Sequence, residues 1–276
     1  MQLTLIRHLW GIDEAWETVF PTIKALGYGG IECPLPPPAE RARFRALLDL
    51  HGFTYIAQIF TGGADVAAHV ASFREQVVAA KTMKPIFINS HSGNDCWSGD
   101  QQRTFFAAVL ACEAETGATV CHELHRGRIL FNPRDTRENL EAFPGLKICA
   151  DYSHWVNVCE RLPNDQPEAF RLAAERCLHL HARVGYEHGP QVPDPRAPEA
   201  ERYVLAHERW WDQIWDSQQR RGFAISTLTP EFGPPGYLHT QPYTQMPVAN
   251  LWDICNWQAK RQAERFAARA TAAKAH

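Results

Sequence analysis

The sequence predicts an α/β fold, a single (β/α)8 TIM barrel that comprises residues 1–276. Three observations predict it. Eight short apolar runs of strand length alternate with longer amphipathic stretches. Strands that are separated by helices need crossover connections and therefore pair in parallel. The length of 276 residues suits one barrel domain. An open doubly wound sheet is the alternative, but no Gly-x-Gly-x-x-Gly motif follows the first run.

Each predicted strand is a short apolar run, and most of these runs have a turn signal close by. The glycine-rich segment GYGG at residues 27–30 leads into the second run and is typical of a helix-to-strand turn. In chain order, the predicted strands are Gln2–Arg7, Gly30–Cys33, Thr54–Ile59, Pro85–Asn89, Thr119–Glu123, Lys147–Asp151, Leu178–Ala182 and Phe223–Leu228.

The stretches between the strands carry apolar residues at three- and four-residue steps, which is typical of helices that cover a sheet. The clearest predicted helices are Pro38–His51, Ala64–Met83, Gln101–Thr116, Thr136–Phe143, Gln166–Glu175, Glu199–Arg221 and Val248–Ala272. Two long loops, Gly185–Pro198 and Phe232–Met246, follow the seventh and eighth strands. We expect both on the C-terminal face of the barrel, where functional loops lie.

The composition is that of an ordinary globular protein, with 45% hydrophobic and 21% charged residues. The formal net charge of -3 gives no basic face for nucleic acid and no reason to expect a membrane surface as partner. No uncharged apolar stretch is long enough to span a bilayer, and the first residues do not form a signal peptide. We therefore expect a soluble, cytoplasmic protein whose partner is a small molecule.

The eight cysteines contain no Cys-x-x-Cys pair and are scattered through apolar stretches. A chain of this length can bury a core that needs no disulfide framework. We therefore expect the cysteines to be small buried side chains in a reducing compartment.

Potential metal ligands stand at the ends of four consecutive predicted strands. Glu123 closes the fifth and Asp151 the sixth; His181 closes the seventh, and Glu231 follows the eighth. The carboxyl ends of barrel strands converge at one mouth. Three carboxylates brought together there would repel one another, and a divalent cation removes the conflict. Carboxylate and imidazole ligands suit Mn²⁺, Mg²⁺, Co²⁺ or Zn²⁺.

Other polar residues are expected near the same mouth. His125 follows Glu123 by two residues and is a candidate base, although a loop histidine fits equally well. Arg126 and Arg128 are candidates for binding a phosphate, a carboxylate or a hydroxyl pair, and His91 closes the fourth strand, where it is expected to contact substrate.

Three further residues have a structural interpretation beside the functional one. His179 is expected to be a core histidine one layer below His181. Glu32 and Gln58 close the second and third strands, and structural hydrogen bonding accounts for them as well as a functional role does.

The four strand-end ligands and two segments, DYSH at residues 151–154 and HELHRGR at residues 122–128, carry a resemblance to a known family. The whole chain resembles the sugar phosphate isomerase/epimerase group of the xylose isomerase-like TIM barrels, which also includes endonuclease IV. The resemblance implies one metal ion, Mn²⁺ above all, held by the four ligands, and is compatible with a homo-oligomer. It further implies that His154 and Arg183 reach the substrate.

In this family, sugar isomerases and epimerases move a proton next to a carbonyl through an enediolate. The resemblance implies that Glu123 and Glu231 share the acid–base work and that the substrate is a sugar, keto-sugar or sugar phosphate. A lyase or dehydratase that acts on a keto-sugar or cyclic ketone is the main alternative, with an acid from Tyr186, Glu187 or His188.

An endonuclease IV-like hydrolase fits less well, because that type has a histidine where this chain has Gln58. An inactive scaffold fits poorly, because uncompensated buried carboxylates are costly.

Overall fold

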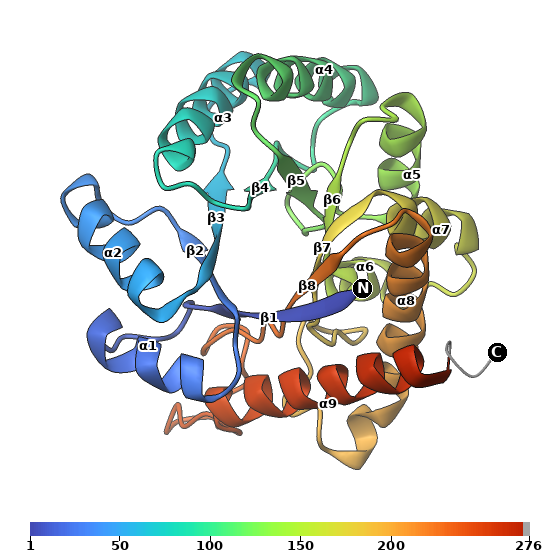
Figure 1. Ribbon diagram of the computed structural model, residues 1–276. Helices are drawn as coiled ribbons and strands as arrows, with labels where there is room; N and C mark the ends of the chain where they lie inside the picture. Colours follow the sequence, from blue (N-terminus) through green and yellow to red (C-terminus); the bar gives the residue numbers. More distant parts are fainter. Residues whose placement is uncertain (273–276) are drawn as a thin grey trace.

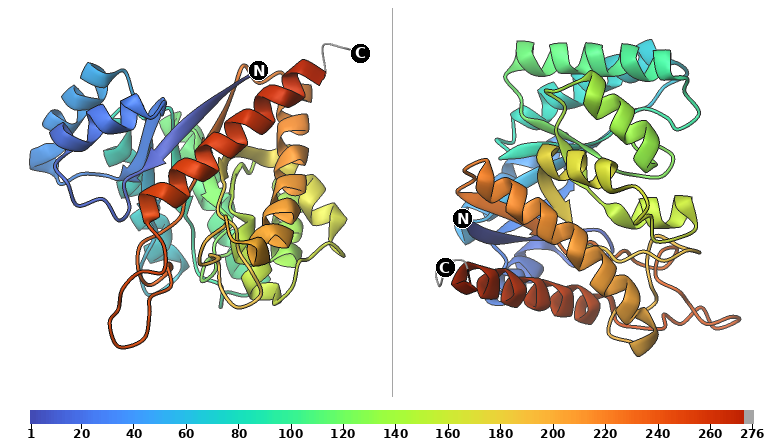
Figure 2. Two further views of the ribbon diagram at one scale, coloured as in Figure 1. Left: turned by 90° about the horizontal axis from the view of Figure 1, so that it is seen from below. Right: turned by 90° about the vertical axis from the view of Figure 1, so that its right-hand side faces the viewer.

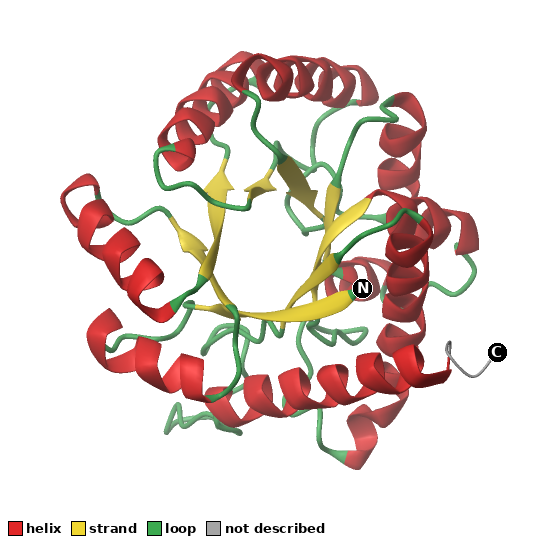
Figure 3. Cartoon of the chain, viewed as in Figure 1, coloured by secondary structure: helices red, strands yellow, loops and turns green. Residues whose placement is uncertain are grey.

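The computed structural model describes residues 1–272 and shows a closed barrel of eight parallel strands in the order β1 to β8, which confirms the fold prediction. The strands form an inner ring and the helices an outer one (Figures 1 and 3). The barrel closes between β1 and β8, where Gln2 pairs with Ile225 and Leu5 with Leu228. The strands are β1 (Gln2–His8), β2 (Gly30–Pro34), β3 (Thr54–Phe60), β4 (Phe87–His91), β5 (Val120–Glu123), β6 (Ile148–Ala150), β7 (Cys177–His181) and β8 (Ile225–Thr229).

The helices cover the outside of the ring, and all seven that the sequence predicts are present with small shifts at their ends. The α-helices are α1 (Trp16–Ala25), α2 (Arg41–His51), α3 (Val66–Lys81), α4 (Gly99–Thr116), α5 (Pro133–Ala142), α6 (Tyr152–Cys159), α7 (Pro167–Arg176), α8 (Glu201–Arg220) and α9 (Leu251–Ala272). Two short 3₁₀ turns, η1 (Pro38–Glu40) and η2 (Pro198–Ala200), precede α2 and α8.

Two helices of the structure, α1 and α6, are not among the predicted helices, and each lacks the sequence pattern that usually indicates a helix. Helix α1 contains Pro21, a residue that normally ends a helical pattern. Helix α6 is short and follows β6 after only Asp151, and its first five residues are all buried. Because a helix that is buried on all sides shows no amphipathic period, its sequence resembles a continuation of the preceding strand.

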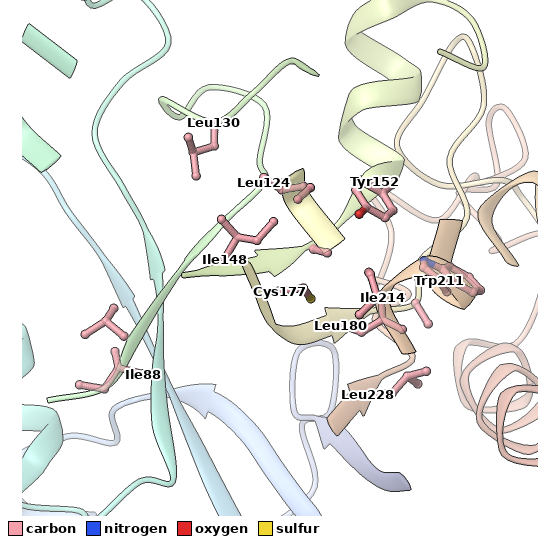
Figure 4. Close-up of a cluster of buried hydrophobic side chains, with 14 of the residues drawn as sticks. Ile88, Leu124, Leu130, Ile148, Tyr152, Cys177, Leu180, Trp211, Ile214 and Leu228 are labelled. Atoms are coloured by element: carbon pink, nitrogen blue, oxygen red, sulfur yellow. The ribbon is translucent and has the colours of Figure 1, made fainter. Parts of the chain in front are cut away.

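The strand side chains form two separate apolar layers, as alternation along a strand requires. Inside the barrel, a small cluster fills the lumen below the carboxyl ends of the strands; its buried members are Ile6, Ile56, Phe87, Cys121 and Cys149. Outside, the strands pack against the helices in a much larger cluster. Figure 4 shows part of that outer cluster, with Leu180 of β7 and Leu228 of β8 near Ile214 of α8.

The loops after β7 and β8 are long, as expected, and the β8 loop extends away from the body of the barrel (Figure 2). All eight cysteines are free; six are buried, whereas Cys96 is exposed and Cys159 is half-buried. Within residues 1–272, none of the helices combines the length and the apolar character that a membrane span requires. Residues 273–276, which the single-domain prediction includes, lie outside the described part of the chain.

Candidate functional site

The four predicted ligands meet at the carboxyl ends of β5 to β8. Glu123 and His181 are the last residues of β5 and β7; Asp151 directly follows β6, and Glu231 lies two residues past β8. Each offers one ligand atom, and these atoms all lie within 4.8 Å of one another. The four side chains are buried, with exposed fractions of 4% or less. The predicted cluster is therefore present, and its binding of a metal stays a prediction.

The donor set fits a divalent cation because several buried atoms in the cluster lack hydrogen bonds. Glu123 Oε1, His181 Nδ1 and Glu231 Oε2 are buried and make no hydrogen bond with any residue in the range 1–272. The last two are 2.8 Å apart, which is an ion-pair distance without the direction of a hydrogen bond. Buried polar atoms normally find partners, so converging atoms without one indicate a group that binds between them.

The charged groups of the cluster shift one another's pKa values. Burial alone would raise the pKa of Glu123, but the nearby His91 and His181 rings outweigh burial and hold it well below its usual value. Burial would likewise raise the pKa of Glu231, which His181 and Arg183 instead lower. Both glutamates are therefore carboxylates at neutral pH. Asp151 differs, because burial prevails over the attraction of Arg183 and raises its pKa to about 6.

Arg183 is bound to the acids of the cluster. Its Nε donates to Asp151 Oδ2 over 3.1 Å, and its Nη2 donates to the same oxygen. Nη2 also lies 3.3 Å from Glu231 Oε2, while Nη1 is buried and has no hydrogen-bond partner in the described part of the chain. Arg183 therefore offsets part of the negative charge of two predicted ligands, Asp151 and Glu231, and its Nη1 could make the substrate contact that the sequence predicts.

A cavity of about 510 Å³ opens above the cluster. Its polar lining comes from strand ends and from the loop after β5, and its apolar lining comes from the loops after β1 and β8 and from β2 and β3. The lining residues are His8, Leu9, Trp10, Cys33, Pro34, Gln58, Phe60, His91, Glu123, His125, Arg128, Arg183, Glu231 and Tyr237. A polar floor under an apolar wall is the usual form of a small-molecule site.

Four of the predicted substrate-binding and catalytic residues line this cavity together with Arg183: His91, His125, Glu123 and Glu231. His91 Nε2 lies 3.0 Å from Glu123 Oε2. His125 Nδ1 donates to the backbone oxygen of Arg126 over 2.5 Å, which leaves Nε2 as an acceptor. Burial, together with the repulsion of His91, lowers the pKa of His125 to about 3, so that its ring is neutral.

Two of the predicted substrate-binding residues do not line the cavity. His154 is fully buried, and its Nε2 is 2.9 Å from Arg183 Nη2. Arg126 Nη1 donates to Asn157 Oδ1 over 3.3 Å, and its guanidinium lies 5.0 Å from the ring centroid of Tyr237. Neither belongs to the cavity lining, but each contacts a residue that does: His154 contacts Arg183, and Arg126 contacts Tyr237.

The sequence matches the model of one protein family over more than half of its length. The family described as xylose isomerase-like TIM barrel matches residues 20–198. The chain belongs to this family. No curated protein matches the chain at a significant level.

The solved structures of similar fold with TM-scores above 0.5 include the following three. A probable 3-DHS dehydratase, AsbF from Bacillus anthracis, is 15% identical with a TM-score of 0.63, covering 93% of this chain and 97% of its own. The 3-keto-D-glucoside 4-epimerase YcjR from E. coli is 13% identical with a TM-score of 0.63, covering 94% and 98%. Endonuclease IV from Thermus thermophilus is 14% identical with a TM-score of 0.53, covering 86% and 94%. At these identities, the likeness is one of fold.

In this xylose isomerase-like barrel, the strand ends that sequence reasoning left undecided or missed also face the site. Glu32 of β2 is fully buried and contacts His181, although the sequence left its role open. His8 lies one residue past the predicted end of the first strand, and its Nε2 is 3.5 Å from Glu231 Oε1. The rule that selected Glu123, a polar residue at the carboxyl end of a strand, also selects His8 and Glu32.

Proposed function

We propose that this protein is a metal-dependent isomerase or epimerase that acts on a keto- or aldo-sugar, or on a sugar phosphate, through an enediolate. The observation that carries the proposal is the cluster of Glu123, Asp151, His181 and Glu231, whose ligand atoms lie within 4.8 Å of one another below a 510 Å³ cavity. Such a cavity has the size of the usual small-ligand sites.

These four side chains would hold one divalent cation, and Mn²⁺ is the ion we propose. When bound, it supplies Lewis-acid stabilisation for the negative charge that develops on the substrate oxygens. Three carboxylates and one imidazole also suit Mg²⁺, Co²⁺ and Zn²⁺, so the choice of ion rests on the resemblance rather than on the donor set.

Glu123 and Glu231 are the proposed acid–base pair. Both line the cavity, and the lowered pKa of each keeps it ionised and ready to accept a proton. One glutamate takes the proton from the substrate carbon. The other, after it has taken up a proton from solvent, gives that proton to the opposite face or to the next carbon. The first outcome is an epimerisation and the second an isomerisation.

The remaining polar groups of the cavity would orient the substrate. His91 and neutral His125 offer imidazole nitrogens to sugar hydroxyls, and Arg183 offers its unpaired Nη1. His125 offers only Nε2, because its Nδ1 donates to the backbone oxygen of Arg126, so we place it second to the two glutamates as a base. His154 and Arg126 would act through the lining residues that they contact, Arg183 and Tyr237.

Exchange of the substrate's carbon-bound proton with solvent tests this proposal. Keto- and aldo-sugars, with and without a phosphate, are incubated in D₂O with the protein and Mn²⁺, Co²⁺ or Mg²⁺ and followed by proton NMR. We expect the signal of the hydrogen next to the carbonyl to disappear for one substrate class, and to persist with chelator-treated protein or with Glu231→Gln. Metal-loaded protein that exchanges no proton in any of these sugars would contradict the proposal.

A lyase that acts on a keto-sugar is the second candidate, and one observation favours it. The hydroxyl of Tyr237 lies at the cavity, 3.5 Å from His125 Nε2, where it can protonate a leaving group. Tyr186 and Glu187, the acids suggested by the sequence, are instead bound to His239 and to Arg202 and Tyr203. In the same NMR experiment, a lyase would give an unsaturated product instead of an exchanged substrate.

A further inference from the structure

Glu32 has no role in the proposed reaction, yet it lies at the centre of the polar network inside the barrel. It belongs to β2, and its side chain is fully buried. Within the described residues, its ion-pair contacts are with two histidines, His179 and His181. A buried carboxylate without a lysine or arginine partner is costly, so its surroundings must compensate for the charge.

The contact between Glu32 and His181 crosses the lumen, because β2 and β7 are not neighbours in the barrel. His181 Nε2 lies 3.0 Å from Oε1 and 3.1 Å from Oε2 of Glu32. The other ring nitrogen, Nδ1, lies 2.8 Å from Glu231 Oε2 and 3.7 Å from Glu123 Oε2. One ring nitrogen of His181 therefore contacts Glu32, and the other lies near two of the proposed metal ligands, Glu231 and Glu123.

We propose that Glu32 is a positioning residue: its carboxylate accepts the Nε2 proton of His181 and thereby presents Nδ1 as the metal-binding atom. The inference rests on the proposed function, since it requires a metal at this cluster. Carboxylates that bind the second nitrogen of a ligating histidine fix the tautomer and the ring orientation and strengthen the histidine as a donor. Glu32 touches none of the reacting atoms.

Glu32 is itself held in place by neutral donors. Thr229 Oγ1 donates to Glu32 Oε2 over 2.6 Å, and Gln58 Nε2 donates to Oε1 over 3.4 Å. Asn89 Nδ2 donates both to Glu32 Oε1, over 3.1 Å, and to Glu123 Oε2, over 2.7 Å. Through Asn89, the position of Glu32 is therefore linked to a second proposed ligand, and the network spans β2, β3, β4, β5 and β8.

The test compares Glu32→Gln with Glu113→Gln, a matched control. Glu113 is also a buried carboxylate whose Oε1 contacts a histidine Nε2, that of His122, at 3.2 Å, but it lies on the outer side of β5. The dissociation constant for Co²⁺ is measured by competition with a chelating indicator dye, and the visible spectrum of bound Co²⁺ is recorded. We expect Glu32→Gln to weaken Co²⁺ binding by about 10- to 100-fold and to change the spectrum, with Glu113→Gln within about twofold of the parent.

The outcomes separate the two proposals. If the parent binds Co²⁺ and Glu32→Gln binds it within about twofold of the parent, the positioning role is overturned while the proposed function stands. If the parent binds neither Co²⁺ nor Mn²⁺, the metal site and the proposed function fail together.

A measurement on the unaltered protein covers the case in which Glu32→Gln does not fold. In Zn²⁺-loaded protein with ¹⁵N-labelled histidines, NMR shows which ring nitrogen of His181 carries the proton. We expect the proton on Nε2 and the metal on Nδ1. A proton on Nδ1, with the metal on Nε2, would overturn the inference.

Discussion

Two buried glutamate–histidine pairs lie on opposite sides of the barrel wall. Inside, Glu32 of β2 contacts Nε2 of His181 at 3.0 Å. Outside, Glu113 of α4 contacts Nε2 of His122 at 3.2 Å. All four side chains are buried, and the exposed fractions of both histidines are 0%. The two pairs therefore share their side-chain types and their burial, although Glu113 also forms an ion pair with Lys147 over 4.0 Å.

They differ at the second imidazole nitrogen. His122 Nδ1 is 2.6 Å from the hydroxyl of Ser92, which in turn contacts Ser90, and the ring is stacked on Phe73. His181 Nδ1 faces carboxylates and makes no hydrogen bond. The outer pair is thus closed, with a protein partner on each side of the ring, whereas the inner pair is open on one side. A satisfied second nitrogen indicates a structural pair, and an unsatisfied one indicates a binding site.

The largest expected effect comes from removing the acid on the open side. Glu231→Gln should weaken Mn²⁺ binding by more than about 100-fold and abolish activity, because an anionic ligand is replaced by a neutral amide. Plasma mass spectrometry of the purified variant and its parent measures the metal content. We expect about one metal ion per chain in the parent, and a variant with unchanged metal content would contradict the assignment of the site.

Breaking the closed pair should affect stability instead. Glu113→Gln leaves a buried imidazole N–H with a weaker acceptor, which we expect to cost about 1–3 kcal/mol of unfolding free energy. Urea unfolding followed by circular dichroism measures it, with Mn²⁺ affinity as the second readout. If Glu113→Gln weakened Mn²⁺ binding and left the unfolding free energy unchanged, the division into a structural outer pair and a metal-binding inner pair would be wrong.

The open pair should also make metal binding dependent on pH. Burial would lower the pKa of His181, but the carboxylates of Glu231, Glu32 and Glu123 outweigh it and hold this pKa well above its usual value. The metal-free ring is therefore protonated at neutral pH, and the ion must displace that proton. Affinity should rise with pH by about tenfold per unit, and more steeply below the Asp151 pKa of about 6.

Isothermal titration calorimetry of Mn²⁺ binding in buffers of different ionisation enthalpy counts the protons that are released. No proton release at neutral pH would mean that His181 is neutral before the metal binds, and the description of the open pair would need revision.

The smallest expected effect concerns the hydroxyl that closes the outer pair. Ser92→Ala removes the partner of His122 Nδ1 and should cost about 0.5–1.5 kcal/mol of unfolding free energy without changing metal affinity. The same urea titration detects it. A cost near zero would show that His122 is held by its aromatic neighbours and by Glu113 alone.

The barrel and the four-residue cluster could be predicted from the sequence because both follow from short-range patterns. Eight apolar runs define the strands, and a polar residue at the end of a strand must face the mouth of the barrel. Glu123, Asp151, His181 and Glu231 all satisfy that rule, and the structure brings them together.

The remainder of the site depends on contacts that no local pattern encodes. The partners Glu32 and His181 are 149 residues apart, so their contact exists only once the barrel has closed. His154 satisfies a sequence pattern of the family, but it is buried against Arg183 and does not line the cavity, which depends on how α6 packs. Tyr237 reaches the cavity from a loop whose path the sequence does not specify.

The bridge between β2 and β7 has a consequence for protein engineering. Anyone who transplants the four ligands onto another barrel would copy residues from β5 to β8 only, which is half of the wall. The acceptor for Nε2 of the grafted histidine would be left behind on β2, together with the donors on β3 and β4 that hold it. The smallest transferable unit of this centre is therefore the complete ring of strands rather than a motif.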